Sequence, residues 1–131
     1  MKVYIWGTGK VAKNFVDKAK WKNSSEWGGY VVSKLGNEEE KDVKCYTEIQ
    51  FDENSVVVIA SSYTNDILKT IIFNTSLTTE QCIALRPTEF SNELNVNMKN
   101  LWKIIENPYA FLNEEEKEIS LDYSRFCRES G

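Results

Sequence analysis

Two glycines near the start of the chain have the spacing found in turns that bind phosphate. Residues 2–6 are a short apolar run of strand-forming residues, and a tight turn follows it directly: Gly7, Thr8, Gly9 and Lys10. With Ala12 the turn fits the pattern G-x-G-x-x-A, in which the first glycine makes the turn, the second admits a phosphate, and the third small residue lets helix and strand approach. The opening N–H groups of the following helix have no acceptor within the helix, and its dipole favours an anion there. We predict that this turn binds a phosphate group; the alternative is a junction that serves packing alone.

Lys10 belongs to the first turn of the predicted helix, close to that phosphate. Its ammonium group would steer an anion, whereas a purely solvated lysine is the competing interpretation. Hydroxyl side chains follow a β-branched run farther along the chain: Ser61, Ser62 and Tyr63. In open parallel sheets, ligands bind beyond the carboxyl ends of the strands, where the strand order reverses. We therefore expect these hydroxyls opposite the glycine turn, with helix capping and turn formation as their alternative roles.

The end of the second predicted strand bears on the choice of ligand. Folds that bind NAD carry an Asp or Glu about 20 residues after the glycines, which holds the adenosine ribose. This chain has Ser33 and Lys34 at that place, and its acidic run at 38–42 comes later. A lysine there favours an extra phosphate over an unmodified ribose. We therefore include Ser33 in the predicted binding site and expect NAD to be disfavoured.

Composition excludes several kinds of catalytic and metal site. The chain has no histidine, so Ser-His-Asp and Cys-His nucleophile systems, histidine metal ligands and a histidine base are absent. Cys45, Cys82 and Cys127 are far apart and form no CxxC pair. This spacing indicates reduced structural thiols instead of a zinc site or a disulfide framework. We assign no catalytic residue and no metal ligand.

Length and charge set further limits. The 131 residues suit one core, and their 41% hydrophobic content is enough to fill it. A net charge of −4, from 16 basic and 20 acidic residues, argues against a nucleic-acid partner, which normally needs a basic face. No apolar run reaches the length of a membrane span, and the sequence opens on a strand without a signal-peptide pattern. We expect a cytoplasmic protein with no membrane span.

The remaining pattern alternates strands and helices. Strands are expected at 2–6, 30–34, 55–62 and 81–85, with a small edge strand at 44–46 and a loop at 21–29. Helices are expected at 10–20 and from Thr64 or Asn65, as the capping residue, to 73. The run at 55–62 is β-branched throughout and should form the centre of the sheet, beside the first strand. These elements predict an α/β fold with a Rossmann-like open parallel sheet of about four to five strands.

The residue pattern in the last third of the chain predicts helices. One helix is expected at 97–106, and a second begins at Asn113 with three glutamates in its first turn, which suit a helix start. The apolar residues of this second helix form no single stripe, so part of it is expected to pack on a neighbour outside this chain. We divide the chain into a Rossmann-like nucleotide-binding domain at 1–90 and a C-terminal helical extension at 91–131, which either packs on that domain or leads to a domain outside this chain.

Three segments resemble a known group of proteins: KVYIWGTGKVAKNF, GGYVVSK and SVVVIASSYTNDILKTI. They are similar to the small Rossmann-like domains of bacterial sugar-modifying enzymes. Examples are the nucleotide-sugar-binding N-terminal domain of glycan acetyltransferases and the domain that precedes FkbM-type methyltransferases or polysaccharide glycosyltransferases. The resemblance covers roughly residues 1–90. It implies that Gly7 to Lys10 surround a phosphate or sugar nucleotide, with Ser61 and Ser62 on the opposite side.

The resemblance has clear departures. No left-handed β-helix repeat follows, and the histidine base of the acetyltransferases is absent. Residues 100–128 resemble the helical linker that leads into a methyltransferase domain, which would make this chain a domain of a longer transferase or a stand-alone remnant. The resemblance implies UDP or a UDP-sugar as the ligand, with NAD(P) second.

Three functions follow from these observations. The leading hypothesis is a module of bacterial surface polysaccharide biosynthesis that binds a small-molecule nucleotide or nucleotide sugar and is not catalytic alone. The second is a small NAD(P)-dependent oxidoreductase, for which Tyr63 is the only proton donor near the site. The third is a degenerate Rossmann fold used for protein contact, as a homo-oligomer or with an adjoining transferase domain. The aromatic residues expected to be exposed motivate this third hypothesis: Trp21, Trp27 and Trp102.

Overall fold

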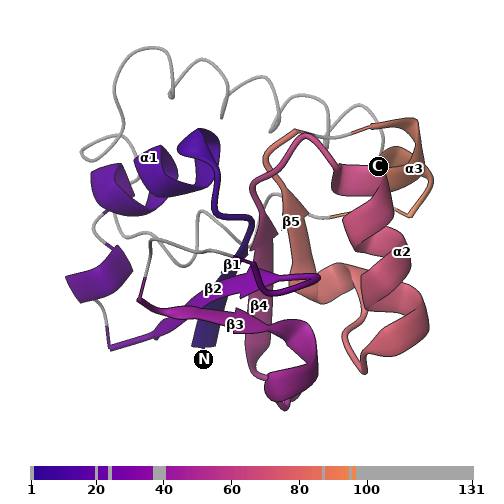
Figure 1. Cartoon of the computed structure of the whole chain (residues 1–131). Helices are drawn as coiled ribbons and strands as arrows, with labels where there is room; N and C mark the ends of the chain where they lie inside the picture. Colours follow the sequence, from indigo (N-terminus) through magenta and orange to yellow (C-terminus); the bar gives the residue numbers. More distant parts are fainter. Residues whose placement is uncertain are drawn as a thin grey trace.

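The computed structural model describes residues 2–19, 21–23, 25–36, 41–86, 88–94 and 96 (Figure 1). Its strands are β1 (Lys2–Trp6), β2 (Trp27–Val32), β3 (Val43–Cys45), β4 (Ser55–Ile59) and β5 (Cys82–Ala84). Its α-helices are α1 (Lys10–Ala19), α2 (Thr64–Asn74) and α3 (Glu89–Glu93). Short 3-10 turns are η1 (Trp21–Asn23), η2 (Tyr46–Glu48) and η3 (Thr79–Gln81).

The five strands form one parallel sheet in the order β3-β2-β1-β4-β5. This is the strand order of a Rossmann-like half sheet, and it confirms the α/β fold class predicted from the sequence. The middle position belongs to β1, whereas the sequence predicted the β-branched run of β4 there. β4 lies directly beside β1, paired from Lys2 with Ser55 to Trp6 with Ile59. The chain reverses its direction of travel across the sheet between these two strands.

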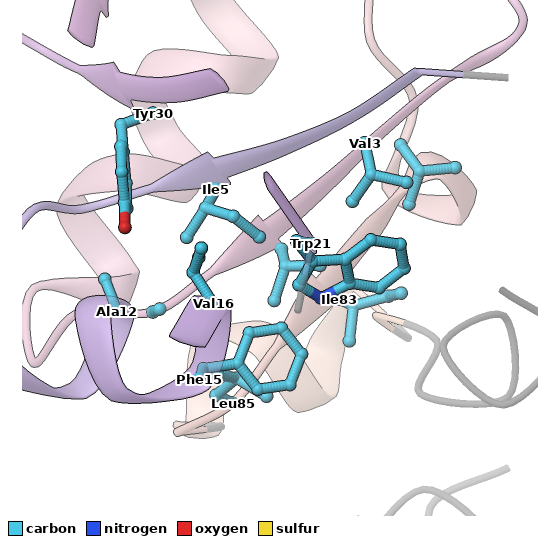
Figure 2. Packing of buried hydrophobic residues seen from close by; sticks show 12 residues of the cluster. Val3, Ile5, Ala12, Phe15, Val16, Trp21, Tyr30, Ile83 and Leu85 are labelled. Carbon is cyan, nitrogen blue, oxygen red and sulfur yellow. The ribbon is translucent and has the colours of Figure 1, made fainter. Parts of the chain in front are cut away.

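Alternate residues of each strand face opposite sides of the sheet. In β1, Val3 and Ile5 pack with residues of α1, whereas Trp6 packs with residues of α2. The two helices therefore cover opposite faces, as Figure 1 shows. Figure 2 shows the cluster on the α1 side, where Phe15 and other helix residues meet side chains of the strands. Because both faces are covered, the interior strands consist almost wholly of apolar residues.

β2 begins earlier than the sequence predicted. Residues 27–29 were expected to be loop, but they belong to the strand, and Trp27 pairs with Val3. A Cβ atom at Gly28 would lie 2.7 Å from Cε1 of Tyr4, so the glycine makes room for a ring on the neighbouring strand. The glycines therefore mark close packing within the sheet instead of the end of a loop.

Trp21 corrects another expectation. The sequence suggested an exposed aromatic residue, but η1 turns this side chain inward, where it is only 4% exposed and belongs to the α1-side cluster. Trp27 is half-buried, and its Nε1 donates to the Asp42 carboxylate at 3.3 Å. Trp102 lies outside the described residues. Among the described residues, the exposed tryptophan surface that motivated a protein-contact function is therefore smaller than predicted.

The described residues include a few beyond residue 90, the predicted domain boundary. α3 spans that position, and Val96 is buried in the α2-side cluster. The helices predicted at 97–106 and from Asn113 lie outside the described residues. In the part of the chain that the structure describes, none of the helices has the length and apolar character required to cross a bilayer.

Candidate functional site

A cleft of about 640 Å³ lies at the carboxyl edge of the sheet. It sits over the junction of β1 and β4, where the strand order reverses, which is the ligand-binding position of open α/β sheets. The structure brings every residue of the sequence-predicted site into the lining of this one cleft: Gly7, Thr8, Gly9, Lys10, Ser33, Ser61, Ser62 and Tyr63. These residues come from the ends of three different strands. The fold, not their order in the chain, brings them together.

Gly7 is required by the way the chain leaves β1. Its φ is +127°, a conformation that residues with a side chain rarely adopt. A Cβ atom there would lie 2.6 Å from the carbonyl oxygen of Ala60, at the end of β4. The Gly7 N–H donates to the Val31 carbonyl at 2.9 Å, and the Ala60 N–H donates to the Trp6 carbonyl at 3.0 Å. The glycine turn (residues 7–9) is thus held against both neighbouring strands.

Gly9 has the opposite surroundings. Its carbonyl accepts a hydrogen bond from the Lys13 N–H at 3.0 Å, which makes it the capping residue of α1. A Cβ atom at Gly9 would meet no other atom within 4 Å. No contact among the described residues therefore requires a glycine at this position. The small residue leaves open space beside the first turn of α1, as the phosphate-binding pattern requires.

The opposite side of the cleft is the β4 loop (residues 61–63). The Tyr63 N–H donates to the Ser61 hydroxyl at 3.1 Å, so Ser61 forms a local turn. Thr64 is buried, and its hydroxyl lies 3.0 Å from the carbonyl oxygens of both Ser61 and Arg86. The sequence predicted Thr64 or Asn65 as the helix cap. The cap is instead Tyr63, and Thr64 connects the β4 loop to the end of β5.

The Thr64 hydroxyl should therefore stabilise this side of the cleft. Replacing Thr64 with valine keeps the shape but removes the donor shared by two carbonyl oxygens, and we expect a loss of about 2 kcal/mol in the free energy of unfolding. Urea denaturation measures this loss. Thr64→Ser is the matched control, because it keeps the hydroxyl and removes only a methyl group. A valine variant at least as stable as the serine variant would contradict this role.

The β2 side of the cleft offers few polar groups among the described residues. Within the part of the chain that the structure describes, this strand and its end contribute Val32 and Ser33 to the lining. The Ser33 hydroxyl accepts a hydrogen bond from Trp6 Nε1 at 3.3 Å, and the Trp6 ring is stacked on Tyr46 with centroids 5.6 Å apart. The four residues directly after β2 offer no carboxylate: Ser33, Lys34, Leu35 and Gly36. A ribose diol therefore has no acidic partner among them.

Two charged residues of the cleft escaped the sequence prediction. Asp66 stands in the first turn of α2, and Arg86 follows β5 directly. Arg86 was within reach of the rule already applied to the other strands, because it lies just beyond the carboxyl end of a predicted strand. Lys10 and Arg86 are both exposed, so the cleft presents one cation beside the glycine turn and one at the end of β5. A ligand with anionic groups suits this arrangement.

The described residues show no sign of a metal centre or a reactive thiol in the cleft. They contain no cluster of three or more Cys, Asp or Glu side chains that could hold a metal ion. Cys82 is fully buried in β5, and burial raises the pKa of its thiol to about 12. It is therefore protonated at neutral pH, and its contribution is packing in the α2-side cluster.

Comparison of the chain with protein families, with curated proteins and with solved structures found no match.

Proposed function

We propose that this chain is a nucleotide-binding module for UDP or a UDP-sugar, associated with bacterial surface polysaccharide biosynthesis and not catalytic alone. The observation that carries the proposal is the convergence of the glycine turn, the opening turn of α1 and the β4 loop on one cleft at the strand-order reversal. The pathway and the uridine base come from the resemblance of the three segments to domains of sugar-modifying enzymes.

The phosphate position follows from the geometry of α1. The first N–H groups of a helix have no intrahelical acceptor, and the helix dipole adds positive potential at that end. Gly9 leaves open space beside them, and Lys10 adds an exposed cation to the same wall of the cleft. Backbone donors with a nearby lysine form the usual protein environment for a phosphate. We therefore place the phosphate of the nucleotide against residues 7–10.

A ligand panel tests the proposal. A ligand that binds only the folded state stabilises it by about 2.7 kcal/mol at 100 times its Kd, and we expect UDP or a UDP-sugar to raise the Tm by about 10 °C at that concentration. The panel consists of UDP, UDP-sugars, CDP, NAD, NADP and S-adenosylmethionine, followed by calorimetric titration of every ligand that shifts the Tm. A full panel without any shift would reject a nucleotide-binding function.

An NAD(P)-dependent oxidoreductase is the second candidate. The strand order and the glycine turn favour it, since dinucleotide-binding folds share both. The residues after β2 oppose it for NAD, because Ser33 and Lys34 stand where a carboxylate is needed. Tyr63 lines the cleft and supplies a hydroxyl. Hydride transfer from NADPH to a carbonyl compound would support this candidate; binding of the nicotinamide cofactor alone would not.

Protein contact is the third candidate. Burial of Trp21 removes one of its sequence arguments, but α2 exposes two adjacent apolar side chains, Ile72 and Phe73, on its outer surface. Light scattering at several protein concentrations tests self-association. A Phe73→Ser variant that turns an associating protein into a monomer would support this candidate.

A further inference from the structure

The cleft is unequal on its two sides. Of the described lining beyond the glycine turn, most belongs to the ends of β4 and β5 and to the first turn of α2, and Val32 and Ser33 are the two residues from β2 and its end. A nucleotide whose phosphate lies against α1 must place its base and ribose on one of these sides. The two sides of the cleft differ in their space and in their side chains, and this difference indicates which side suits a nucleoside.

Tyr63 offers a surface for stacking on the β4 side. The described residues have four exposed large apolar side chains, Leu35, Tyr63, Ile72 and Phe73, and of these only Tyr63 lines the cleft. Tyr63 is 70% exposed, whereas its backbone is held by the Ser61 hydroxyl and by the neighbouring buried Thr64. When a flat ligand group stacks on this ring, only the two side-chain torsions of Tyr63 must become ordered, and the loop that carries it is already in place.

Asp66 supplies a carboxylate, which the described residues at the end of β2 do not add to the lining. It is the only acidic residue in the described lining of the cleft, and it lies one helical turn from the β4 loop. Ribose hydroxyls and the N–H of a uracil ring are donors, and a carboxylate accepts from both. Among the described residues at the β2 end, Ser33 is the only polar side chain in the lining, and its oxygen already accepts from Trp6 Nε1.

We propose that the nucleoside half of the ligand lies on the β4–β5 side of the cleft, with its base on the Tyr63 ring and its hydroxyl or N–H donors facing Asp66. This assignment rests on the proposed nucleotide-binding function. It places the nucleoside away from the end of β2, where dinucleotide-binding folds hold the adenosine ribose. Arg86, at the far end of the same side, then faces the acceptor atoms of the ligand.

Calorimetric titration of pyrophosphate and of UDP into four proteins tests the assignment. The proteins are the wild type, Tyr63→Ala, Tyr63→Phe and Phe73→Ala, the last being a matched truncation of an exposed aromatic residue outside the cleft. We expect Tyr63→Ala to weaken UDP binding about tenfold, because stacking of one base on an aromatic side chain supplies roughly that factor. Pyrophosphate binding should stay unchanged, and Tyr63→Phe and Phe73→Ala should bind UDP like the wild type.

The outcomes separate the two proposals. If wild-type protein binds neither ligand, the proposed function fails, and the assignment fails with it. If UDP binds and Tyr63→Ala leaves its affinity unchanged, the assignment alone is overturned. Equal losses for UDP and pyrophosphate would also overturn it, since the ring would then support the phosphate site. A fifth protein, Ser33→Ala, tests the opposite side of the cleft: a tenfold loss of UDP affinity in this variant, with none in Tyr63→Ala, would move the nucleoside to the β2 side.

Discussion

A Gly7→Ala variant is expected to lose about 3 kcal/mol of stability, with a Tm lower by about 10 °C. Two independent effects contribute. The residue has φ of +127°, where a side chain strains the backbone. Its new Cβ would also lie 2.6 Å from the Ala60 carbonyl oxygen. That oxygen belongs to the backbone of the segment leaving β4, so a rotamer change cannot relieve the clash.

The measurement is thermal and urea unfolding followed by circular dichroism. Gly9→Asn is the matched control, because it also replaces a glycine of the same turn, but in open space and at a helix-capping position where Asn is favoured. We expect the control to stay within about 0.5 kcal/mol of the wild type. Equal stabilities of the two variants would show that the close approach of the glycine turn to β4 is not a constraint on the fold.

The sequence was sufficient to predict a parallel sheet because its strongest signals were long and regular. The continuous β-branched run of β4 predicted a strand covered on both faces, and the apolar spacing of α1 predicted which face packs on the sheet. The glycine turn predicted a strand before it and a helix after it. A βαβ unit and a second strand–helix–strand unit leave few topologies for a short parallel sheet, and the observed order is one of them.

Local errors arose where a distant residue decided the structure. The early start of β2 depends on the Tyr4 ring above Gly28, a contact between strands that lie far apart in the chain. α3 was missed because its capping pair is Thr88 and Ser91, in which a serine stands where the usual pattern has Glu or Gln. The central strand is β1 and not β4, and this order is likewise a property of the whole sheet.

The candidate site was predictable to the extent that one rule covered it. Residues after the carboxyl ends of parallel strands gather at one edge, and this rule found the glycine turn, Ser33 and the β4 loop. The same rule, applied to β5, reaches Arg86. To predict that Asp66 lines the cleft, the orientation of the first turn of α2 had to be known, and the sequence pattern did not give it. The hydrogen bond from Trp6 to Ser33 was equally invisible, because it joins two strand ends.

Replacing Gly9 with aspartate is expected to separate binding from folding. Aspartate is a favoured capping residue at the start of a helix, and its charge suits the helix dipole, so the apo protein should be as stable as the wild type or slightly more stable. The same carboxylate would stand in the open space beside the first turn of α1, where we place the phosphate. It would compete for the backbone donors and repel the ligand. We expect UDP affinity to fall about a hundredfold, the equivalent of losing a charge-assisted hydrogen bond of roughly 3 kcal/mol.

Gly9→Asn separates charge from size in this experiment, because asparagine has the shape of aspartate without its charge. Calorimetry should find the asparagine variant weaker than the wild type in UDP binding but stronger than the aspartate variant, since only the latter adds repulsion. Raising the salt concentration should narrow the gap between the two variants, because ions screen exposed charges. An aspartate variant that binds UDP with wild-type affinity would place the phosphate elsewhere. The glycine turn would then serve packing alone, and any ligand of the cleft would be held by the β4–β5 side.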